Sequence, residues 1–457
     1  MINGRIELYE DCIKFPNISD KTNIMAHLVY VTPNVGNIIE HAGRTCYRSF
    51  NSIKEDSYKS FISNIVKSGH ESVIEHSNLI YVILKTNRKD LRTDSNNINR
   101  FLINVIMYNG LLKISENQAF YVISGNIRMF KDLVRQYLEI KTYNNKSNPI
   151  IDDIIRSFYT LPEYFFTDMI NDGSMDKNKF KLNPKFIESN NELRENILND
   201  YVTVINHDNF SFKVRGYTIK TPDGVSEVHR VSIPQAVLKK HNRVTLIINA
   251  PRYITHQIVR HRLASYSQAS QRYCKEDVLS VYIPEDIKAN PAANATANML
   301  FNNALATYNA LTDQGIKKED ARSVLTNAQM STVVMTATVE EFDHFIKVRA
   351  DKAAQNFIRD MIAVPLKEYM EKYYSETLKD MQKAKAIQKS NTKYHKKQQS
   401  MNEAKNRKGR HAKPHNNASG KPGGRPNGNK PKGNKPTGKP PRKQQPGGKF
   451  KFNPKKK

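Results

Sequence analysis

The chain has 457 residues, 72 Lys and Arg against 44 Asp and Glu, a formal net charge of +28, three cysteines and no tryptophan. The cysteines are widely spaced and form no CxxC pair, which argues against a disulfide framework or a cysteine zinc site. We expect a soluble, intracellular chain, because no apolar run approaches the ~20 residues of a membrane helix and the N-terminus lacks a secretory signal pattern.

The first predicted element is a short buried strand at 78–86, where NLIYVILKT is rich in β-branched residues. From 87 to 241 the pattern changes, and we interpret this stretch as an insertion of mixed α/β character. It contains an Asn- and Asp-rich piece, a helix from Asn126 and strand-like runs around 200–219. The apolar face of that helix consists of Ile127, Phe130, Val134, Tyr137 and Leu138.

A second buried strand is predicted at 244–250, with the sequence VTLIINA. Pro251 is expected in the first turn of the following helix, about 252–260, because its missing N–H donor costs nothing there. Further on, TVEE at 338–341 is a capping box that opens a helix carrying Phe342, Phe345 and Ile346. Helical character extends to about Tyr374.

Residues 381–457 hold most of the excess charge, with 24 basic residues and one acidic residue, Glu403. They contain no Leu or Val, so apolar burial cannot offset their ordering entropy, and we expect a disordered tail. The basic residues, with Tyr394, Phe450 and Phe452 for stacking, predict affinity for RNA or DNA backbones. A solubility tail, an acidic partner protein or lipid headgroups would fit the same charge.

The densest polar cluster is RHRLASYSQASQRY at 260–273, at a predicted junction between helix and loop. Guanidinium groups bind phosphate bidentately, and hydroxyls and backbone donors complete the shell of oxygen contacts, so this composition indicates an anion site. A solvated basic loop is the alternative. Val259, Leu263 and Ala264 are interleaved with the charges and favour a partly buried segment whose arginines need partners.

A second polar segment, GHESVIEH at 69–76, precedes the first strand. His70 and His76 are six residues apart, whereas a zinc-protease helix needs histidines four apart, so we predict no metal site. Taken alone, the segment is typical of a polar turn that enters a strand.

Together, the chain's motifs resemble the flavin-dependent thymidylate synthases, the ThyX family. The resemblance rests on Arg260-His261-Arg262 followed by Ser270, on GHESVIEH, and on four further segments that occur in the family's order. These are AGRTCYRS (42–49), HQIVRHR (256–262), ARSVL (321–325) and FIKVRADKAAQNFIR (345–359). The resemblance implies an α+β, ThyX-like fold, a mixed sheet with flanking helices, whose core comprises 1–86 and 242–380, with the insertion at 87–241 and the tail at 381–457. VISGNIRMFKDLVR (122–135) also resembles a segment of longer relatives.

The resemblance further implies reductive methylation of dUMP to dTMP in a cytoplasmic homotetramer, in a bacterium or a virus-infected host cell. FAD would be the cofactor, and NADPH and methylenetetrahydrofolate the co-substrates. The residues expected to contact FAD are Ser72, Glu75, Arg260, His261, Arg262 and Arg349. Those expected to hold dUMP are Gln257, Arg260, Gln268, Ser270, Arg272, Arg322 and Arg359, some from a neighbouring subunit.

Arg359 is expected to be catalytic, as a permanent positive charge placed where the deprotonated uracil ring becomes negative. On one helix, Arg349 and Arg359 would lie ~15 Å apart, and a break near Asp351, a candidate N-cap, would change that distance. Gln268 follows Ser267 where many members have Asn-Glu, so any carboxylate role is lost there, and Ala269 also departs from the common pattern.

Two other functions deserve comparison with the sequence. The cysteine-dependent thymidylate synthases need a Pro-Cys-His setting, which Cys12, Cys46 and Cys274 all lack. A nucleic-acid-binding protein built on a ThyX-like scaffold, with altered or lost catalysis, stays open as the alternative because of the basic tail.

Overall fold

The computed structural model describes residues 26–84, 113–116, 120–144, 148–183, 193, 195–210, 217–220, 226–229, 240–275 and 280–375, and residues 378, 379, 383 and 386. The Asn- and Asp-rich piece before residue 113 lies outside the described residues. So does the basic tail, apart from residues 383 and 386.

The first sheet is antiparallel, with the strand order β1-β2-β4-β3. Its strands are β1 (Ala26–Val31), β2 (Leu79–Leu84), β3 (Lys113–Glu116) and β4 (Phe120–Gly125). The predicted first strand is confirmed as β2. The buried side chains of this sheet form one core with the helices α1 (Val35–Tyr47), α2 (Ser57–Lys67), α4 (Ile127–Asn144), α5 (Pro149–Phe158) and α6 (Thr167–Asn171).

The second sheet is also antiparallel, with the order β10-β11-β9-β6-β5. Its strands are β5 (Asn196–Asn199), β6 (Val202–His207), β9 (Arg243–Pro251), β10 (Ala264–Gln268) and β11 (Met330–Thr338), and β7 (Tyr217–Lys220) and β8 (Ser226–His229) form a separate pair. The predicted second strand is confirmed as β9. The fold is therefore α+β. Strands from the 87–241 stretch pair within both sheets, β4 with β2 and β6 with β9.

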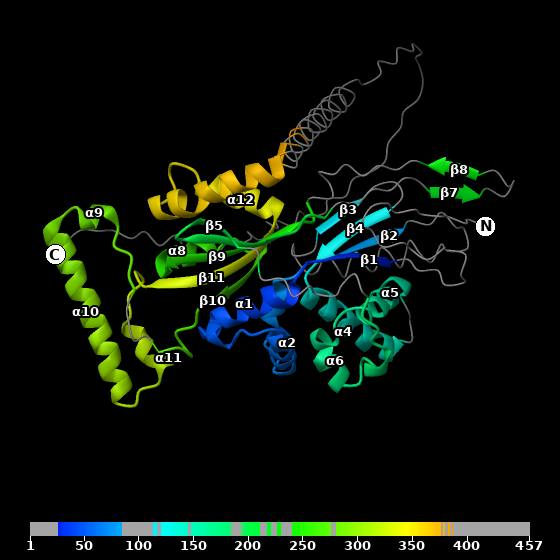
Figure 1. The fold of residues 1–457 in the computed structure, drawn as a ribbon, viewed down its shortest axis with the longest axis horizontal. Coiled ribbons are helices and arrows are strands. Elements are labelled where there is room, and N and C mark those ends of the chain that lie inside the picture. The colour runs from blue at the N-terminus through cyan, green and yellow to red at the C-terminus, as the bar shows by residue number, and fades with distance from the viewer. Residues whose placement is uncertain are drawn as a thin grey trace, which may run out of the picture. The chain divides into compact units, whose positions relative to one another are not determined.

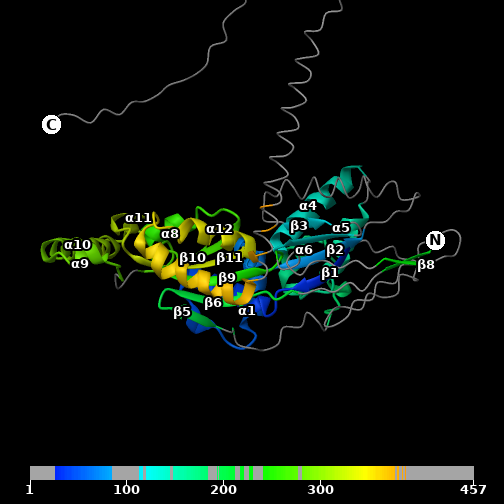
Figure 2. The same ribbon diagram turned by 90° about the horizontal axis from the view of Figure 1, so that it is seen from above.

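The two faces of the second sheet pack against different elements. On one face, Leu246 and Met335 pack against Phe342 of α12 (Val339–Arg349), in a core that includes α8 (Arg252–Ile258) and the π-helix η8 (Phe357–Ala363). On the other face, Thr336 bonds His76, which follows the 3-10 helix η2 (Glu71–Glu75). Figure 1 shows α12 above this sheet and α1 below it, and Figure 2 gives the view from above.

The helices after β9 agree with one prediction and differ from three. Thr338 caps α12 as predicted, because its hydroxyl accepts from the Glu341 N–H, at 3.4 Å. Pro251, however, is the N-cap of α8 rather than a first-turn residue, since its ψ of 151° is extended. The helix also ends at Ile258 rather than at Arg260. The chain does break after Arg349, but Asp351 is not an N-cap. It accepts from Ala353 N in a turn, and the helix η8 begins at Phe357.

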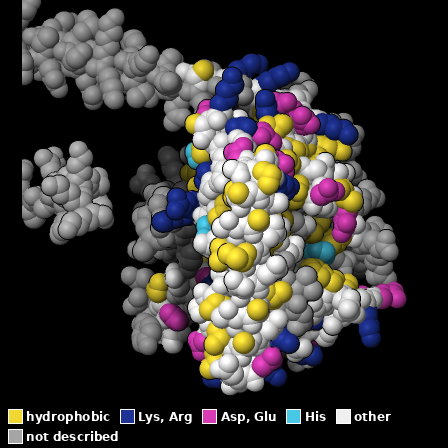
Figure 3. Space-filling model, turned by 90° about the vertical axis from the view of Figure 1, so that its left-hand side faces the viewer, with side chains coloured by type: hydrophobic (Ala, Val, Ile, Leu, Met, Phe, Trp, Pro, Cys, Tyr) yellow, Lys and Arg dark blue, Asp and Glu magenta, His cyan; other side chains and the backbone are white. Residues whose placement is uncertain are grey.

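The remaining helices include α9 (Glu285–Lys288), α10 (Pro291–Asp313), α11 (Lys318–Ala321) and the short 3-10 helix η7 (Arg322–Val324). In α10, a helix of 23 residues, only Ala304 and Tyr308 are buried. Met299 and Leu300 are 61% and 56% exposed, and Figure 3 shows apolar side chains on the side of the molecule where α10 lies. Among the described helices, none is long and apolar enough to cross a membrane.

Candidate functional site

The polar cluster at 260–273 begins just after α8, the helix that connects β9 to β10. Its middle, Ala264–Gln268, is a strand that pairs with β11, so the prediction of a helix-to-loop junction is corrected. Ser265 and Ser267 are buried on one face of the strand, and Tyr266 packs on the other against the α12 core. This alternation directs neighbouring residues of the cluster to opposite faces of the sheet.

The first group of expected site residues lies between α8 and α12, and we call Gln257, Arg260, His261 and Arg349 the guanidinium cluster. Arg349 donates from Nε to His261 Nε2 at 3.0 Å, and from Nη2 and Nη1 to the main-chain and side-chain oxygens of Gln257 at 3.0 and 3.4 Å. Gln257 in turn donates to Gln355 at 2.8 Å. Two segments that are about 90 residues apart in the chain therefore converge on one polar surface.

This cluster is rich in positive charge. Burial, with the charges of Arg349 and His344, lowers the pKa of His261 to about 4, so its ring is neutral and accepts the Arg349 hydrogen bond. Burial and then the nearby Arg260 lower the pKa of Arg349. All three Arg349 nitrogens donate to neutral groups rather than to a carboxylate. An anion would offset the repulsion between the two guanidinium groups.

The second group surrounds the end of β10. Gln268 donates to the hydroxyls of Thr255 and Ser331, at 3.1 Å each. Arg272 donates to the Glu319 carboxylate at 2.6 Å, and Arg322 donates to the Glu319 main-chain oxygen at 3.1 Å.

The loop that links these residues is fixed through Ser270. Its N–H bonds the Cys46 main-chain oxygen at 3.0 Å, and its hydroxyl accepts from Arg272 N at 3.1 Å. Ser270 is thus linked to Arg272 through the main chain, and Glu319 bonds both Arg272 and Arg322.

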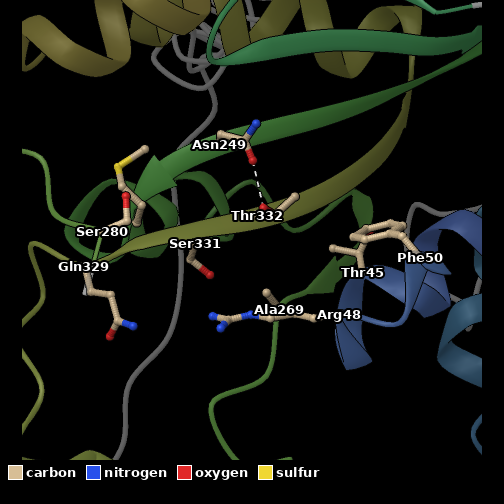
Figure 4. Close-up of a pocket in the computed structure, with 10 residues that line it drawn as sticks. Thr45, Arg48, Phe50, Asn249, Ala269, Ser280, Gln329, Ser331 and Thr332 are labelled. Carbon is tan, nitrogen blue, oxygen red and sulfur yellow. Dashed lines mark hydrogen bonds between the residues drawn. The ribbon is translucent and has the colours of Figure 1, made fainter. Parts of the chain in front are cut away.

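A cavity of about 470 Å³ adjoins this second group. Figure 4 shows the Arg48 side chain reaching from the end of α1 toward Ser331 and Gln329, with Ala269 beside it. The remaining lining residues are Thr45, Phe50, Asn249, Ser280, Met330 and Thr332. Arg48 has a φ of 50°, a left-handed conformation that is uncommon for a non-glycine residue. Ser331 borders both the cavity and the Gln268 side chain.

The third group lies on η2, within the segment 69–76. Ser72 is exposed, and Glu75 accepts from Arg128 of α4 at 2.6 Å. The next residue, His76, is fully buried between Ser267 and Thr336, at 2.9 and 2.8 Å. Burial, with the charge of Arg243, lowers the pKa of His76 to about 3. A neutral His76 therefore fixes η2 against β10 and β11.

The residues expected to contact FAD thus form two groups on opposite faces of the second sheet. His261 and Arg349 lie with α8 and α12, whereas Ser72 and Glu75 lie on η2, on the α1 side. One copy of the chain does not bring all of them to a single surface. Arg262 is exposed and lies two residues before the start of β10.

Among the described residues, the hydrogen bonds of the Arg359 guanidinium group go to residues outside the guanidinium cluster. Its guanidinium group donates to both carboxylate oxygens of Asp360, at 2.8 Å each, and to main-chain oxygens of Lys352 and Ala354 at 3.3 Å. Arg359 therefore closes the turn between α12 and η8 in this conformation. Its expected catalytic role stays a prediction.

Two arginines that contact these groups, Arg128 beside Glu75 and Arg48 in the cavity, were not among the expected site residues. Arg128 falls within VISGNIRMFKDLVR, whose resemblance to a segment of longer relatives drew attention to these residues. The sequence did not indicate that Arg128 would contact Glu75. Arg48 falls within AGRTCYRS, and no local pattern indicates that its side chain lines a cavity with strand residues some 280 positions later.

Comparison with known proteins identifies the same two parts of the chain. The family model described as "Thymidylate synthase complementing protein" matches residues 27–92 and 234–373. The flavin-dependent thymidylate synthase of Thermococcus onnurineus is 39% identical over 114 residues, which cover 24% of this chain and 46% of that protein. That of Geobacter sulfurreducens is 35% identical over 127 residues, which cover 27% and 55%.

The enzyme of Thermococcus kodakarensis is 36% identical over 138 residues, which cover 29% of this chain and 56% of that protein. The chain spans about half the length of the curated relatives it matches. The matched parts contain η2, α8, β10 and α12, the elements that carry the expected site residues. These two parts of the chain, 27–92 and 234–373, therefore belong to the family of flavin-dependent thymidylate synthases.

Proposed function

We propose that the protein converts dUMP to dTMP by reductive methylation, with FAD as cofactor, methylenetetrahydrofolate as carbon donor and NADPH as reductant. The observation that carries this proposal is the guanidinium cluster. It joins residues expected for the substrate and for the cofactor on one surface, with two arginines near each other and, within the described part of the chain, no carboxylate bonded to Arg349.

The donors of the cluster fit FAD, which is a dianion with a hydrogen-bonding ring system. Arg260 and Arg349 would bind its anionic or carbonyl oxygens, and the exposed Arg262 would add a third positive charge. When bound, FAD supplies the redox chemistry of the methyl transfer. Because His261 is neutral, it keeps Arg349 oriented without adding further positive charge to the cluster.

The second group suits the substrate's phosphate. Ser270, Arg272 and Arg322 supply a hydroxyl and two guanidinium groups. To bind a phosphate, Arg272 must first break its ion pair with the Glu319 carboxylate. Gln257 and Gln268 supply amides for the uracil carbonyl and N–H groups.

The uracil ring becomes a better nucleophile at carbon 5 when it loses a proton, and a fixed guanidinium group stabilises the resulting negative charge. The contacts favour Arg349 over Arg359 for this role. Arg349 lies beside Gln257, whereas both oxygens of Asp360 neutralise Arg359.

We also propose that the active site is completed by a second copy in a homotetramer. Two observations support this. The expected FAD contacts lie on opposite faces of one sheet, and α10 carries exposed Met299 and Leu300 with Asp313 as its only charged residue. Exposed apolar side chains on such a face are suited to a subunit contact.

For the tail, 381–457, we propose weak binding to RNA or DNA in addition to catalysis, on the basis of its 24 basic residues. A cytoplasmic location follows from the proposed metabolic role and is part of the proposal.

The test is dTMP formation by the purified full chain, given dUMP, methylenetetrahydrofolate and NADPH, with FAD supplied or stripped. FAD-dependent product, measured by mass spectrometry, is the expected result. Folded protein that binds FAD and forms no dTMP would refute the proposed reaction, and folded protein that binds no FAD would refute the proposed cofactor as well.

A further inference from the structure

We propose that Arg48 is a further binding residue for dUMP in this protein, and that it contacts the phosphate group of the substrate from the cavity at the end of α1. This inference rests on the proposed function, because it assigns the cavity to the same substrate. Arg48 follows α1 directly and is not among the residues expected to contact either dUMP or FAD.

The composition of the cavity wall is the first observation. The cavity has a volume of about 470 Å³, within the range of about 300–1,000 Å³ that is usual for small-ligand pockets. Of its ten lining residues, all in the described part of the chain, Arg48 has the only charged side chain, and six others carry neutral hydroxyl or amide groups. Such a wall, with a guanidinium group and no carboxylate among its lining residues, suits an anionic ligand that is rich in oxygen atoms.

The loop expected to hold dUMP forms one side of this cavity. Ala269 lines the cavity, and its N–H donates to the Thr332 main-chain oxygen at 2.9 Å. The next residue, Ser270, donates from its N–H to the main-chain oxygen of Cys46 at 3.0 Å, two residues before Arg48. These bonds fix the loop to β11 and to the end of α1. Arg48 and the dUMP loop therefore border the same space.

The direction of the Arg48 side chain is the second observation. Figure 4 shows it reaching toward Ser331 and Gln329, with Ala269 beside it. The Ser331 hydroxyl accepts a hydrogen bond, at 3.1 Å, from Gln268, which is expected to contact dUMP. Arg48 is also exposed, so a ligand in the cavity can reach it. The guanidinium group thus points toward the part of the cavity that adjoins the expected dUMP residues.

The backbone at Arg48 is the third observation. Arg48 is the C-cap of α1, with a φ of 50° and a ψ of 38°, and its N–H bonds the main-chain oxygens of Arg44 and Thr45. Glycine or asparagine adopts this left-handed conformation at the least cost, whereas an arginine is strained in it. A function of the side chain would account for the strain. A cation at this end of α1 also stabilises the helix dipole, and the experiment separates the two roles.

The phosphate is the part of dUMP that suits a guanidinium group. At neutral pH the phosphate carries the negative charge of dUMP, and the uracil ring is neutral until it loses a proton. In this conformation the Glu319 carboxylate bonds Arg272 at 2.6 Å, and the Glu319 main-chain oxygen accepts from Arg322 at 3.1 Å. Arg48 adds a third guanidinium group from the α1 side of the loop. FAD also contains phosphate groups, so the experiment measures both ligands.

The experiment measures the affinity of the full chain for dUMP by isothermal titration calorimetry in the presence of FAD, for the wild type and for Arg48→Gly. Glycine adopts a φ of 50° without strain, so this variant should fold. Lys59→Ala is the matched control, because it removes one positive charge from α2 and Lys59 is 51% exposed. We expect Arg48→Gly to weaken dUMP binding about tenfold or more, with a shallower salt dependence, and Lys59→Ala to change neither.

Deoxyuridine, which lacks the phosphate, tests where on the nucleotide Arg48 acts. Its affinity, measured by competition with dUMP at millimolar concentration, should differ by less than about twofold between the wild type and Arg48→Gly. An equal loss of affinity for dUMP and for deoxyuridine would mean that Arg48 acts on the base, the sugar or the loop, and the proposal would be wrong. A loss of FAD affinity, measured by flavin fluorescence, with unchanged dUMP affinity would also overturn it.

Arg48→Asn separates binding from the stability of α1. Asparagine is tolerated at a positive φ, but its neutral side chain is too short to replace the guanidinium group. We expect this variant to lose affinity for dUMP as Arg48→Gly does. If Arg48 only stabilised the end of α1 through its charge, both variants would unfold at a lower temperature and the folded protein would bind dUMP as the wild type does, which would refute the proposal.

The outcomes also separate this inference from the proposed function. Wild-type protein that forms dTMP, together with folded Arg48→Gly that binds dUMP as the Lys59→Ala control does, overturns only the role of Arg48. Wild-type protein that binds FAD but no dUMP overturns both the proposed substrate and the role of Arg48.

Discussion

Replacement of Lys131 by Met tests whether α4 is held on η2 by buried charge. Lys131 has a fully buried side chain, and its Nζ donates to Glu71 at 2.5 Å, to Asp168 at 2.7 Å and to the Phe165 main-chain oxygen at 2.9 Å. Methionine has a similar volume but no charge, so Lys131→Met removes all three interactions without creating a large cavity.

The expected cost follows from the carboxylates that remain. Removal of one partner of a buried ion pair typically destabilises a protein by about 3–5 kcal/mol, because the other charge stays buried. Here Arg135 still contacts both Glu71 and Asp168, so we expect the lower end, about 3 kcal/mol. The control, Lys141→Met, breaks a partly exposed pair with Asp152 and should cost less than about 1 kcal/mol.

The assay is urea denaturation of the full chain, followed by far-ultraviolet circular dichroism at fixed protein concentration. The chain contains no tryptophan, so indole fluorescence is not available as a probe. An equal, small loss of unfolding free energy in Lys131→Met and Lys141→Met would refute the reasoning. It would mean that apolar packing, and not the buried ions, holds α4 on η2.

Four further predictions concern the site, the assembly, the tail and acid stability. Arg349→Lys should lower kcat/KM for dUMP about 100-fold, because lysine cannot reproduce the forked contact with Gln257, whereas Arg359→Lys should have a smaller effect; the reverse order in steady-state kinetics would return the main role to Arg359. Leu300→Asp on α10 should reduce the mass seen by light scattering, and an unchanged mass would exclude this face from the subunit contact. A chain that ends at Asp380 should keep its activity but lose retention on immobilised polynucleotide at low salt, and equal retention by both chains would contradict the proposed role of the tail. The pKa of Glu71 is about 2 in the folded protein against an ordinary value of 4.5, which applies to the unfolded chain, so its stabilising effect is complete above pH 4.5 and should disappear as the pH falls toward 2; Glu71→Gln should flatten that part of the stability profile measured by thermal melting.

Local features of the chain determined much of the fold and the composition of the site. The runs at 78–86 and 244–250 predicted β2 and β9, and the capping box at 338–341 predicted the start of α12. The reason is that burial periodicity and helix capping depend on residues a few positions apart. The Arg-His-Arg motif likewise indicated an anion site, because guanidinium chemistry is visible in the sequence itself.

Only the tertiary structure decided which of these residues meet. Arg349 joins Gln257 and His261, whereas Arg359, ten residues later, turns to Asp360, because the chain breaks after α12. The ion pair between Arg128 and Glu75 depends on β4 pairing with β2, in a stretch whose sequence predicted a helix from Asn126 but not what that helix packs against. Contacts between residues far apart in the chain arise from the packing of whole strands and helices, and no local pattern specifies which distant side chain that packing will bring into reach.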